Sequence, residues 1–254
     1  KARPWFDIDQ QLEAVCAAVS PHFKIDVDFN GLLLGVDQAA PLLKKLESKH
    51  PNLAIVETPI PQSDIAGNAT LRQKIGIPIS MHFGNPPVPT AVREGVCDGF
   101  VVSGGATKVR SHGNFAQHHD MPFWLQLVGT GLTTMWSVHL GAVLKNARWP
   151  YIPCLNIYEH PLIDDFQIEG GLIPVPERPG LGVDVNQEAI ECYTVEKDYV
   201  KVDPRQIHTI HWPDGRDTYH SDGSYRDDFL AGKLPGFLPG VSLDRQIDDG
   251  SDTF

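Results

Sequence analysis

The chain has 254 residues, which is within the usual size of one large domain and long enough to bury a sizeable core. A formal net charge of -11 and the lack of any basic run exclude a nucleic-acid-binding surface. No stretch approaches the roughly 20 apolar residues of a membrane span, and the four scattered cysteines fit reduced thiols. We therefore expect a cytoplasmic globular protein that binds neither nucleic acid nor membrane.

Helical and strand-like patterns alternate along the first 158 residues. A helix is predicted at residues 12–19, where apolar side chains recur with helical spacing, and a strand follows at residues 25–30. The later pairs of predicted helix and strand are 40–50 and 53–57, 63–75 and 77–82, 90–96 and 99–103, 108–119 and 123–128, and 133–146 and 154–158. Six strands with intervening helices predict an α/β fold with a parallel sheet and right-handed crossovers, of the (β/α) barrel type.

The alternation ends after Pro176. Two short strand patterns, 207–212 and 216–220, flank Pro213-Asp-Gly215 and predict a β-hairpin. The last residues are rich in proline and glycine and contain an acidic run at 248–252, which predicts an extended tail with a mobile end. We divide the chain into a barrel domain, residues 1–192, and a C-terminal extension with a hairpin and an irregular tail, residues 193–254.

Three metal-ligating side chains end successive predicted strands: Asp28, Glu57 and His82. Because the carboxyl ends of parallel strands share one rim, we expect these side chains to form a divalent metal site. A helix cap or a solvated strand end would explain either carboxylate alone, but a pair in register favours metal ligands. For His82 the alternative is a histidine that forms hydrogen bonds at the rim without metal.

Four motifs occur in a fixed order: Asp28-x-Asn30, Glu57-x-Pro59, Gly104-Gly105 before a helix, and Pro-Gly-Leu-Gly-Val at 179–183. This order resembles the mandelate racemase and muconate lactonizing enzyme branch of the enolase superfamily over about residues 1–190. The resemblance implies a TIM-like (β/α) barrel behind an N-terminal α+β capping domain. It also implies that Mg²⁺ stabilises the enediolate formed when a base removes the proton beside a carboxylate, with Mn²⁺ or another divalent ion as the alternative.

Lys1 is similar to the second lysine of the Lys-x-Lys pair that ends the second barrel strand in this family. The resemblance implies that Lys1 is a base and that the given sequence starts inside the barrel. The capping domain and first barrel strand would then be missing, and the full-length chain or a partner would supply them. A lysine base must be neutral, and a nearby cation together with desolvation lowers its pKa. The simplest alternative is that Lys1 is frayed.

The sequence departs from the family pattern at two further strand ends. Racemases and many dehydratases of this branch use an Asp-His dyad where this chain has Ser103 and Gln126, and neither residue is a general base near neutral pH. Relatives resembling glucarate dehydratase place an Asn ligand at the position similar to His82, which supports a metal role there. Glu159 and His160 are candidate acids or substrate contacts. The candidate substrate contacts are Asn30, Ser103, Gln126 and Trp124, and core packing is the alternative for Trp124.

These features predict a divalent-metal-dependent lyase. It would be a dehydratase that removes the proton α to the carboxylate of a sugar acid and then expels a β-hydroxyl. The alternatives are a cycloisomerase or epimerase of the same superfamily, or a catalytically silent member that keeps its metal for binding or assembly. The expected partners are a small-molecule carboxylate and further copies of the chain in a homo-oligomer.

Overall fold

The chain forms two compact units, Lys1–Ile79 with Val200–Phe254, and Ser80–Tyr199. The computed structural model describes residues 1–164, 167–201, 203–221 and 223–248. Residues 200–254 of the C-terminal extension therefore belong to the same unit as the first residues of the chain. The division at residue 192 remains a prediction.

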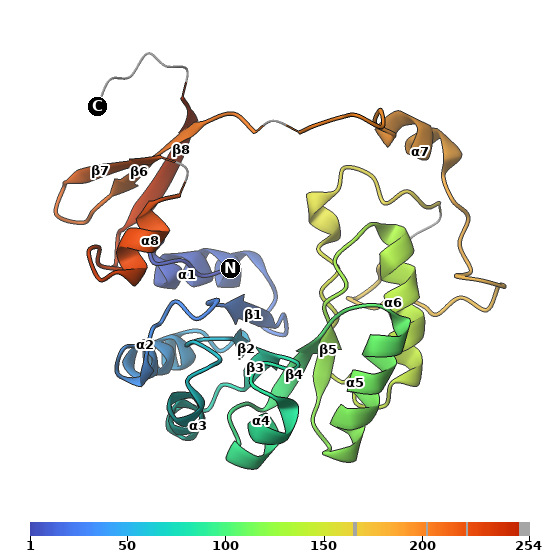
Figure 1. Ribbon diagram of the computed structural model, residues 1–254, viewed down its shortest axis with the longest axis horizontal. Helices are drawn as coiled ribbons and strands as arrows, with labels where there is room; N and C mark the ends of the chain where they lie inside the picture. Colours follow the sequence, from blue (N-terminus) through green and yellow to red (C-terminus); the bar gives the residue numbers. More distant parts are fainter. Residues whose placement is uncertain (165–166, 202, 222, 249–254) are drawn as a thin grey trace. The chain divides into compact units, whose positions relative to one another are not determined.

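The first unit starts with the predicted alternation of helices and strands (Figure 1). Its elements are α1 Ile8–Ala18, β1 Ile25–Asp28, α2 Val36–Lys49, β2 Leu53–Glu57, α3 Ile65–Lys74 and the start of β3 Ile79–His82. Strands β1 and β2 run parallel. The helices start a few residues away from the predicted positions, because N-cap residues determine where a helix begins. The side chains of Asp7 and Asp64 accept hydrogen bonds from backbone amides in the first turns of α1 and α3.

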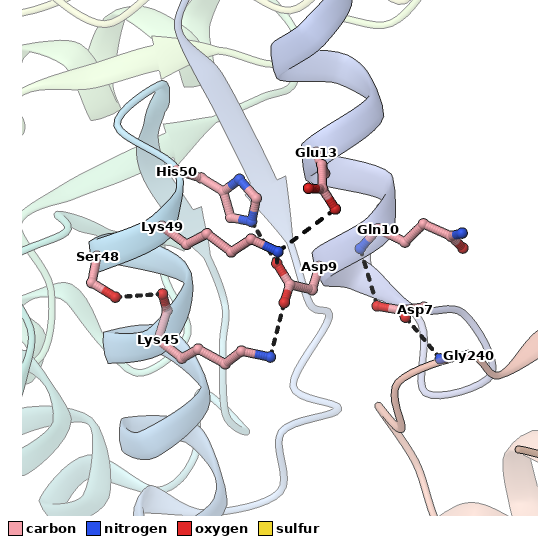
Figure 2. Close-up of polar contacts among 9 residues, drawn as sticks. All are labelled: Asp7, Asp9, Gln10, Glu13, Lys45, Ser48, Lys49, His50 and Gly240. Carbon is pink, nitrogen blue, oxygen red and sulfur yellow. Dashed lines mark hydrogen bonds and ion pairs between the residues drawn. The ribbon is translucent and has the colours of Figure 1, made fainter.

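A cluster of charges around Asp9 binds α1 to α2 (Figure 2). Lys45 Nζ lies 2.8 Å from Asp9 Oδ2, and Lys49 Nζ and His50 Nε2 lie 3.0 Å and 2.7 Å from Asp9 Oδ1. Hydrogen bonds from Lys45 above all, and then from His50 and Lys49, hold the pKa of Asp9 well below its usual range. The carboxylate therefore stabilises the contact between the two helices only while it is ionised.

Replacing Asp9 by Asn is expected to lower the free energy of unfolding by about 1–2 kcal/mol near neutral pH, since solvent screens part of the cluster. A carboxylate with a lower pKa in the folded chain stabilises the fold above its ordinary pKa. The difference between variant and parent should therefore shrink progressively as the pH falls below about 4. Urea unfolding of both proteins over this pH range measures it, and a difference that persists unchanged in acid would contradict the expectation.

The second unit contains parallel strands and helices as well. Its elements are the rest of β3, α4 Val88–Glu94, β4 Gly99–Val102, α5 Ala106–His118, β5 Phe123–Leu125, α6 Gly131–Val143, the 3₁₀ helix η1 Leu155–Ile157 and α7 Gln187–Tyr193. Strands β3, β4 and β5 pair in parallel, and the strand order of the sheet is β1-β2-β3-β4-β5. Among the described residues of both units, no helix is long and apolar enough to cross a bilayer.

The sixth strand, predicted at 154–158, is wrong, because η1 occupies these residues. Pro153 has no amide hydrogen to donate to a neighbouring strand. Cys154 takes a left-handed conformation with φ 56°, which interrupts extended backbone. The side chain of Ile157 is 64% exposed, so this apolar segment does not become part of the buried sheet.

Two tryptophans fill the space beside β4 and β5. Trp124 is fully buried, and its ring centroid lies 5.5 Å from that of Trp149. Gly99 admits the Trp149 ring, because a Cβ atom at this position would lie 2.3 Å from Trp149 Cη2 and 2.5 Å from the carbonyl oxygen of Pro122. This packing agrees with the core interpretation of Trp124, and its contact with substrate stays a prediction.

Replacing Gly99 by Ala is expected to lower the free energy of unfolding by about 1–3 kcal/mol, since the methyl group overpacks a site bounded by backbone and by the half-buried Trp149 ring. Replacing Gly141 by Ala is the matched control. Gly141 lies within α6, and no atom beyond the backbone of its own helix lies within 4 Å of the position that a Cβ would take, so Ala should raise helix stability by up to about 1 kcal/mol. Urea unfolding compares the two variants, and equal effects would contradict the packing argument.

The C-terminal extension contains β6 Gln206–His211, β7 Asp217–Ser221, α8 Tyr225–Leu230 and β8 Ser242–Ile247. Strands β6 and β7 pair antiparallel, which confirms the predicted hairpin. The irregular tail is wrong for residues 242–247, because β8 pairs with β6 and completes an antiparallel sheet of order β7-β6-β8. Most of the acidic end lies outside the described residues.

Candidate metal and proton-transfer site

Asp28 and Glu57 lie side by side at the carboxyl ends of β1 and β2. They face each other in the parallel register, and their exposed fractions are only 6% and 4%. Asp26 lies two residues earlier on the same face of β1. Burial, and then the negative charge of Glu57, raises the pKa of Asp26 to about 6. The carboxylates of two neighbouring strands therefore create a negative site that favours a cation.

Lys1 and Asn30 both bind Asp28. Lys1 Nζ forms an ion pair with Asp28 Oδ2. The Asn30 backbone amide donates to Asp28 Oδ1 at 2.7 Å, and Asn30 Nδ2 donates to Asp28 Oδ2 at 2.8 Å. The Ala2 amide donates to the backbone carbonyl of Asp28 at 2.9 Å, so the segment after Lys1 runs along β1. The structure thus brings together four predicted site residues: Lys1, Asp28, Asn30 and Glu57.

Arg3 is a residue of this site that the sequence interpretation missed. Its Nη2 donates to Asn30 Oδ1 at 2.8 Å, and its Nη1 donates to the carbonyl oxygen of Ala2 at 2.7 Å. The sequence contained a signal for Arg3, because it lies two residues after Lys1. Residues two apart in extended backbone point to the same side, so Arg3 is expected on the side where Lys1 meets Asp28. A guanidinium here is suited to an anionic group of a substrate.

Oxygen ligands from Asp28 and Glu57 fit a hard divalent cation such as Mg²⁺. Such an ion is commonly held by one or two carboxylates, while water and substrate fill its other positions. The burial and register of this pair meet that requirement. Within the residues that the structure describes, no three His, Cys, Asp or Glu side chains are grouped closely enough to hold a metal. The role of Asp28 and Glu57 as the donor pair for such an ion stays a prediction.

His82, the third predicted ligand, ends β3 in the second unit. It is half-buried and lies in register with Val101 of β4. The next residue, Phe83, packs elsewhere: its ring centroid lies 3.9 Å from that of His112 and 5.2 Å from that of Phe100. Phe83 is therefore a half-buried residue that packs against β4 and α5. The metal role of His82 stays a prediction.

Ser103 and Gln126 follow β4 and β5 directly. The Gln126 amide donates to the carbonyl oxygen of Val102 at 2.9 Å, which continues the pairing of the two strands beyond their regular ends. Both side chains are half-buried. The structure therefore places two neutral polar groups at neighbouring strand ends, where both can donate and accept hydrogen bonds.

Glu159 and His160 lie at a small cavity of the second unit. Tyr193, from the end of α7, donates its hydroxyl hydrogen to Glu159 Oε2 at 3.2 Å, and His160 Nδ1 accepts the Leu162 amide at 2.9 Å. The cavity has a volume of about 140 Å³, and Thr130 contributes to its wall. Desolvation and the negative charge of Glu159 raise the pKa of Tyr193. Tyr193 was missed because its helix lies 34 residues from Glu159 in the sequence.

The family model described as enolase C-terminal domain-like matches residues 4–189. The chain belongs to this family. It is 26% identical over 210 residues to an N-succinylamino acid racemase of Amycolatopsis sp., covering 79% of this chain and 55% of the racemase. It is 26% identical over 166 residues to the o-succinylbenzoate synthase of Bacillus subtilis strain 168, covering 61% of this chain and 44% of the synthase. The chain thus spans about half the length of these relatives.

The family fold is also found among solved structures. A mandelate racemase/muconate lactonizing family protein from Azoarcus sp. EbN1 superposes with a TM-score of 0.59 at 24% identity, covering 74% of this chain and 54% of that protein. Together with the family match, this likeness confirms the predicted enolase-type β/α barrel fold. The family resemblance deduced from the four motifs is confirmed as well.

Proposed function

We propose that this chain is the barrel part of a divalent-metal-dependent enzyme that removes the proton α to a carboxylate. The observation that carries the proposal is the buried pair Asp28 and Glu57, in register, with Lys1 bound to Asp28. A proton next to a carboxylate is weakly acidic, so its removal needs a cation near the developing charge and a well-placed base. Asp28 and Glu57 would hold the cation, which when bound would offset that negative charge.

Lys1 is the proposed base, and its neighbours prepare it for this role. A lysine accepts a proton only when it is neutral, and a cation that shares Asp28 with Lys1 favours the neutral amine. Asn30 fixes both oxygens of Asp28 through two hydrogen bonds. Arg3 lies next in this network and offers the positive charge that an anionic substrate requires.

We propose a sugar acid as the substrate and loss of its β-hydroxyl as the overall reaction. The α-proton passes to Lys1, the electron pair of the broken C–H bond forms a double bond, and the β-hydroxyl leaves as water after protonation. Glu159 and His160 are the proposed proton donors, and Tyr193 can bind a substrate hydroxyl beside them. Ser103 and Gln126 also favour this reaction, because neither side chain can serve as the second base that two-base racemisation requires.

A second candidate is proton exchange without loss of water, as in a racemase of N-acylated amino acids. The identity of 26% with the Amycolatopsis racemase over 79% of this chain favours it. In this reaction the α-proton would return to the same carbon from a group other than Lys1. The two candidates share the metal and the first proton transfer and differ in the fate of the β-substituent.

Incubation of the full-length protein with Mg²⁺ and a panel of acids in D₂O tests both candidates. The panel should contain sugar acids and N-succinylamino acids, and proton NMR with mass spectrometry follows each. Loss of one water from a sugar acid is the expected result. Deuterium at the α-carbon without water loss, in a succinylated amino acid, would replace it with the second candidate. A panel in which no acid takes up deuterium would contradict both candidates and favour a catalytically silent family member.

A further inference from the structure

The C-terminal extension holds the segment that connects Lys1 to α1. The Phe237 amide donates to the carbonyl oxygen of Pro4 at 2.7 Å, and the Asp7 amide donates to the carbonyl oxygen of Val241 at 3.2 Å. Asp7 Oδ2 also accepts the Gly240 amide at 2.8 Å, as Figure 2 shows. Residues 237–241 thus fix both ends of residues 4–7 through backbone hydrogen bonds, which do not depend on the identity of exposed side chains.

Trp5 anchors the same segment through its side chain. It is only 5% exposed and packs against Tyr225 edge to face, with ring centroids 4.2 Å apart. The other buried members of this cluster all come from the extension: Ile210, Trp212, Tyr225, Val241 and Leu243. The hydrophobic core of the extension is therefore completed by a residue four positions after Lys1, and the two cannot separate without exposing this core.

Phe237 connects this segment to the strand that carries Asp28. While its amide binds Pro4, its ring centroid lies 5.9 Å from that of Phe29, the fully buried residue between Asp28 and Asn30. Phe237 has a left-handed backbone with φ 55°, a conformation that is strained for a residue of this size. Such strain persists only where the surroundings impose it, and it often marks a position with a functional role.

We propose that the C-terminal extension sets the distance between Lys1 and Asp28, and that Phe237 is its central positioning residue. The proposal rests on the proposed function of Lys1 as base and Asp28 as metal ligand. In this proposal Phe237 acts through Lys1 and Asp28 and not on the reacting atoms. It binds the Lys1 segment through its amide and the Asp28 strand through its ring, so it fixes two groups that must act within hydrogen-bonding distance.

Three variants of the extension separate positioning from mere stability. Phe237→Gly removes the ring, relieves the backbone strain and keeps the amide donor. Phe237→Tyr keeps the ring and should restore parent behaviour. Phe229→Leu is the control, because Phe229 packs on Phe237, with ring centroids 6.5 Å apart, and belongs to α8 of the same extension. It leaves both the Pro4 hydrogen bond and the Phe29 contact in place.

The full-length protein is measured with Mg²⁺, below the unfolding temperature of every variant. Phe237→Gly is expected to lower kcat at least about tenfold with KM within about threefold, and to speed amide exchange in residues 2–7 and 29–31. Phe237→Tyr and Phe229→Leu should stay within about twofold of the parent in kcat. An unchanged kcat in Phe237→Gly, or an equal loss in Phe229→Leu, would overturn the proposal.

The exchange measurement separates this proposal from the proposed function. If the parent protein turns over no acid, kcat gives no information, but amide exchange in residues 2–7 still compares the variants. Faster exchange in Phe237→Gly alone supports the positioning contact, and identical exchange in all variants overturns it. Loss of turnover in a Lys1 variant, by contrast, tests the proposed function and leaves the contact of Phe237 unaffected.

Discussion

Asp28→Asn is expected to weaken Mg²⁺ binding about 100-fold and to lower turnover at least as much. Asn keeps the size of Asp and one oxygen, but it removes the charge of one of only two carboxylates in the donor set. A loss of about 2.7 kcal/mol in binding free energy corresponds to this factor. The variant should still fold, because it relieves repulsion between Asp28 and the buried Glu57 beside it.

Isothermal titration of the full-length protein with Mg²⁺, and separately with Mn²⁺, measures this effect. Asp26→Asn is the matched control: it makes the same chemical change on the same face of β1, two residues from the strand end. Two residues of a strand span about 7 Å, so Asp26 acts on the ion only from a distance, and its replacement should weaken Mg²⁺ binding by less than about tenfold. An unchanged affinity in Asp28→Asn, or equal losses in the two variants, would contradict the proposed metal site.

Removing the amine of Lys1 has the second large effect. Lys1→Met is expected to lower kcat by about 10²–10⁴-fold, the usual contribution of a positioned general base. Lys1→Arg should be as inactive, although it keeps a positive charge that can pair with Asp28, because a guanidinium does not lose its proton in proteins. The pair of variants therefore distinguishes a base from a structural cation.

Loss of the α-proton signal of the best substrate in D₂O, followed by proton NMR, measures this first step directly. The affinity for Mg²⁺ should stay within about threefold in both variants, since Asp28 and Glu57 remain. Substantial loss of the α-proton signal with Lys1→Arg would show that Lys1 is not the base. The search for it would then turn to the second unit, where Glu159 and His160 lie.

The fold was largely predictable because local patterns determine most of it. Apolar periodicity located α1 to α6 and β1 to β5 within a few residues, and Pro213-Asp-Gly215 located the hairpin. Strand β8 was missed because its partner β6 lies more than 30 residues away, and local proline and glycine content does not reveal such pairing. The false strand at 154–158 was as apolar as the true ones, but its backbone turns at Cys154.

The candidate site was predictable where chemistry follows strand ends. Asp28 and Glu57 end strands of similar spacing, so their register followed from the alternation of helices and strands. Arg3 could have been found from its spacing to Lys1, but Tyr193 was missed because its partner Glu159 is distant in sequence. A side chain that reaches a site from a neighbouring loop or helix leaves no periodic signal, and only the three-dimensional structure connects it.

The position of Trp5 has a consequence for biosynthesis. Asp7 and Gly240, which fix the Trp5 segment, are 233 residues apart, and the second unit, Ser80–Tyr199, is inserted between them in the sequence. The early strands therefore emerge from the ribosome long before the residues that cover Trp5. Until residue 243 has been made, the burial partners of that indole are incomplete, and we expect it to be a site for chaperones or aggregation. The Trp5 segment, near the start of the sequence, therefore becomes fully buried only after the last fifth of the sequence has been made.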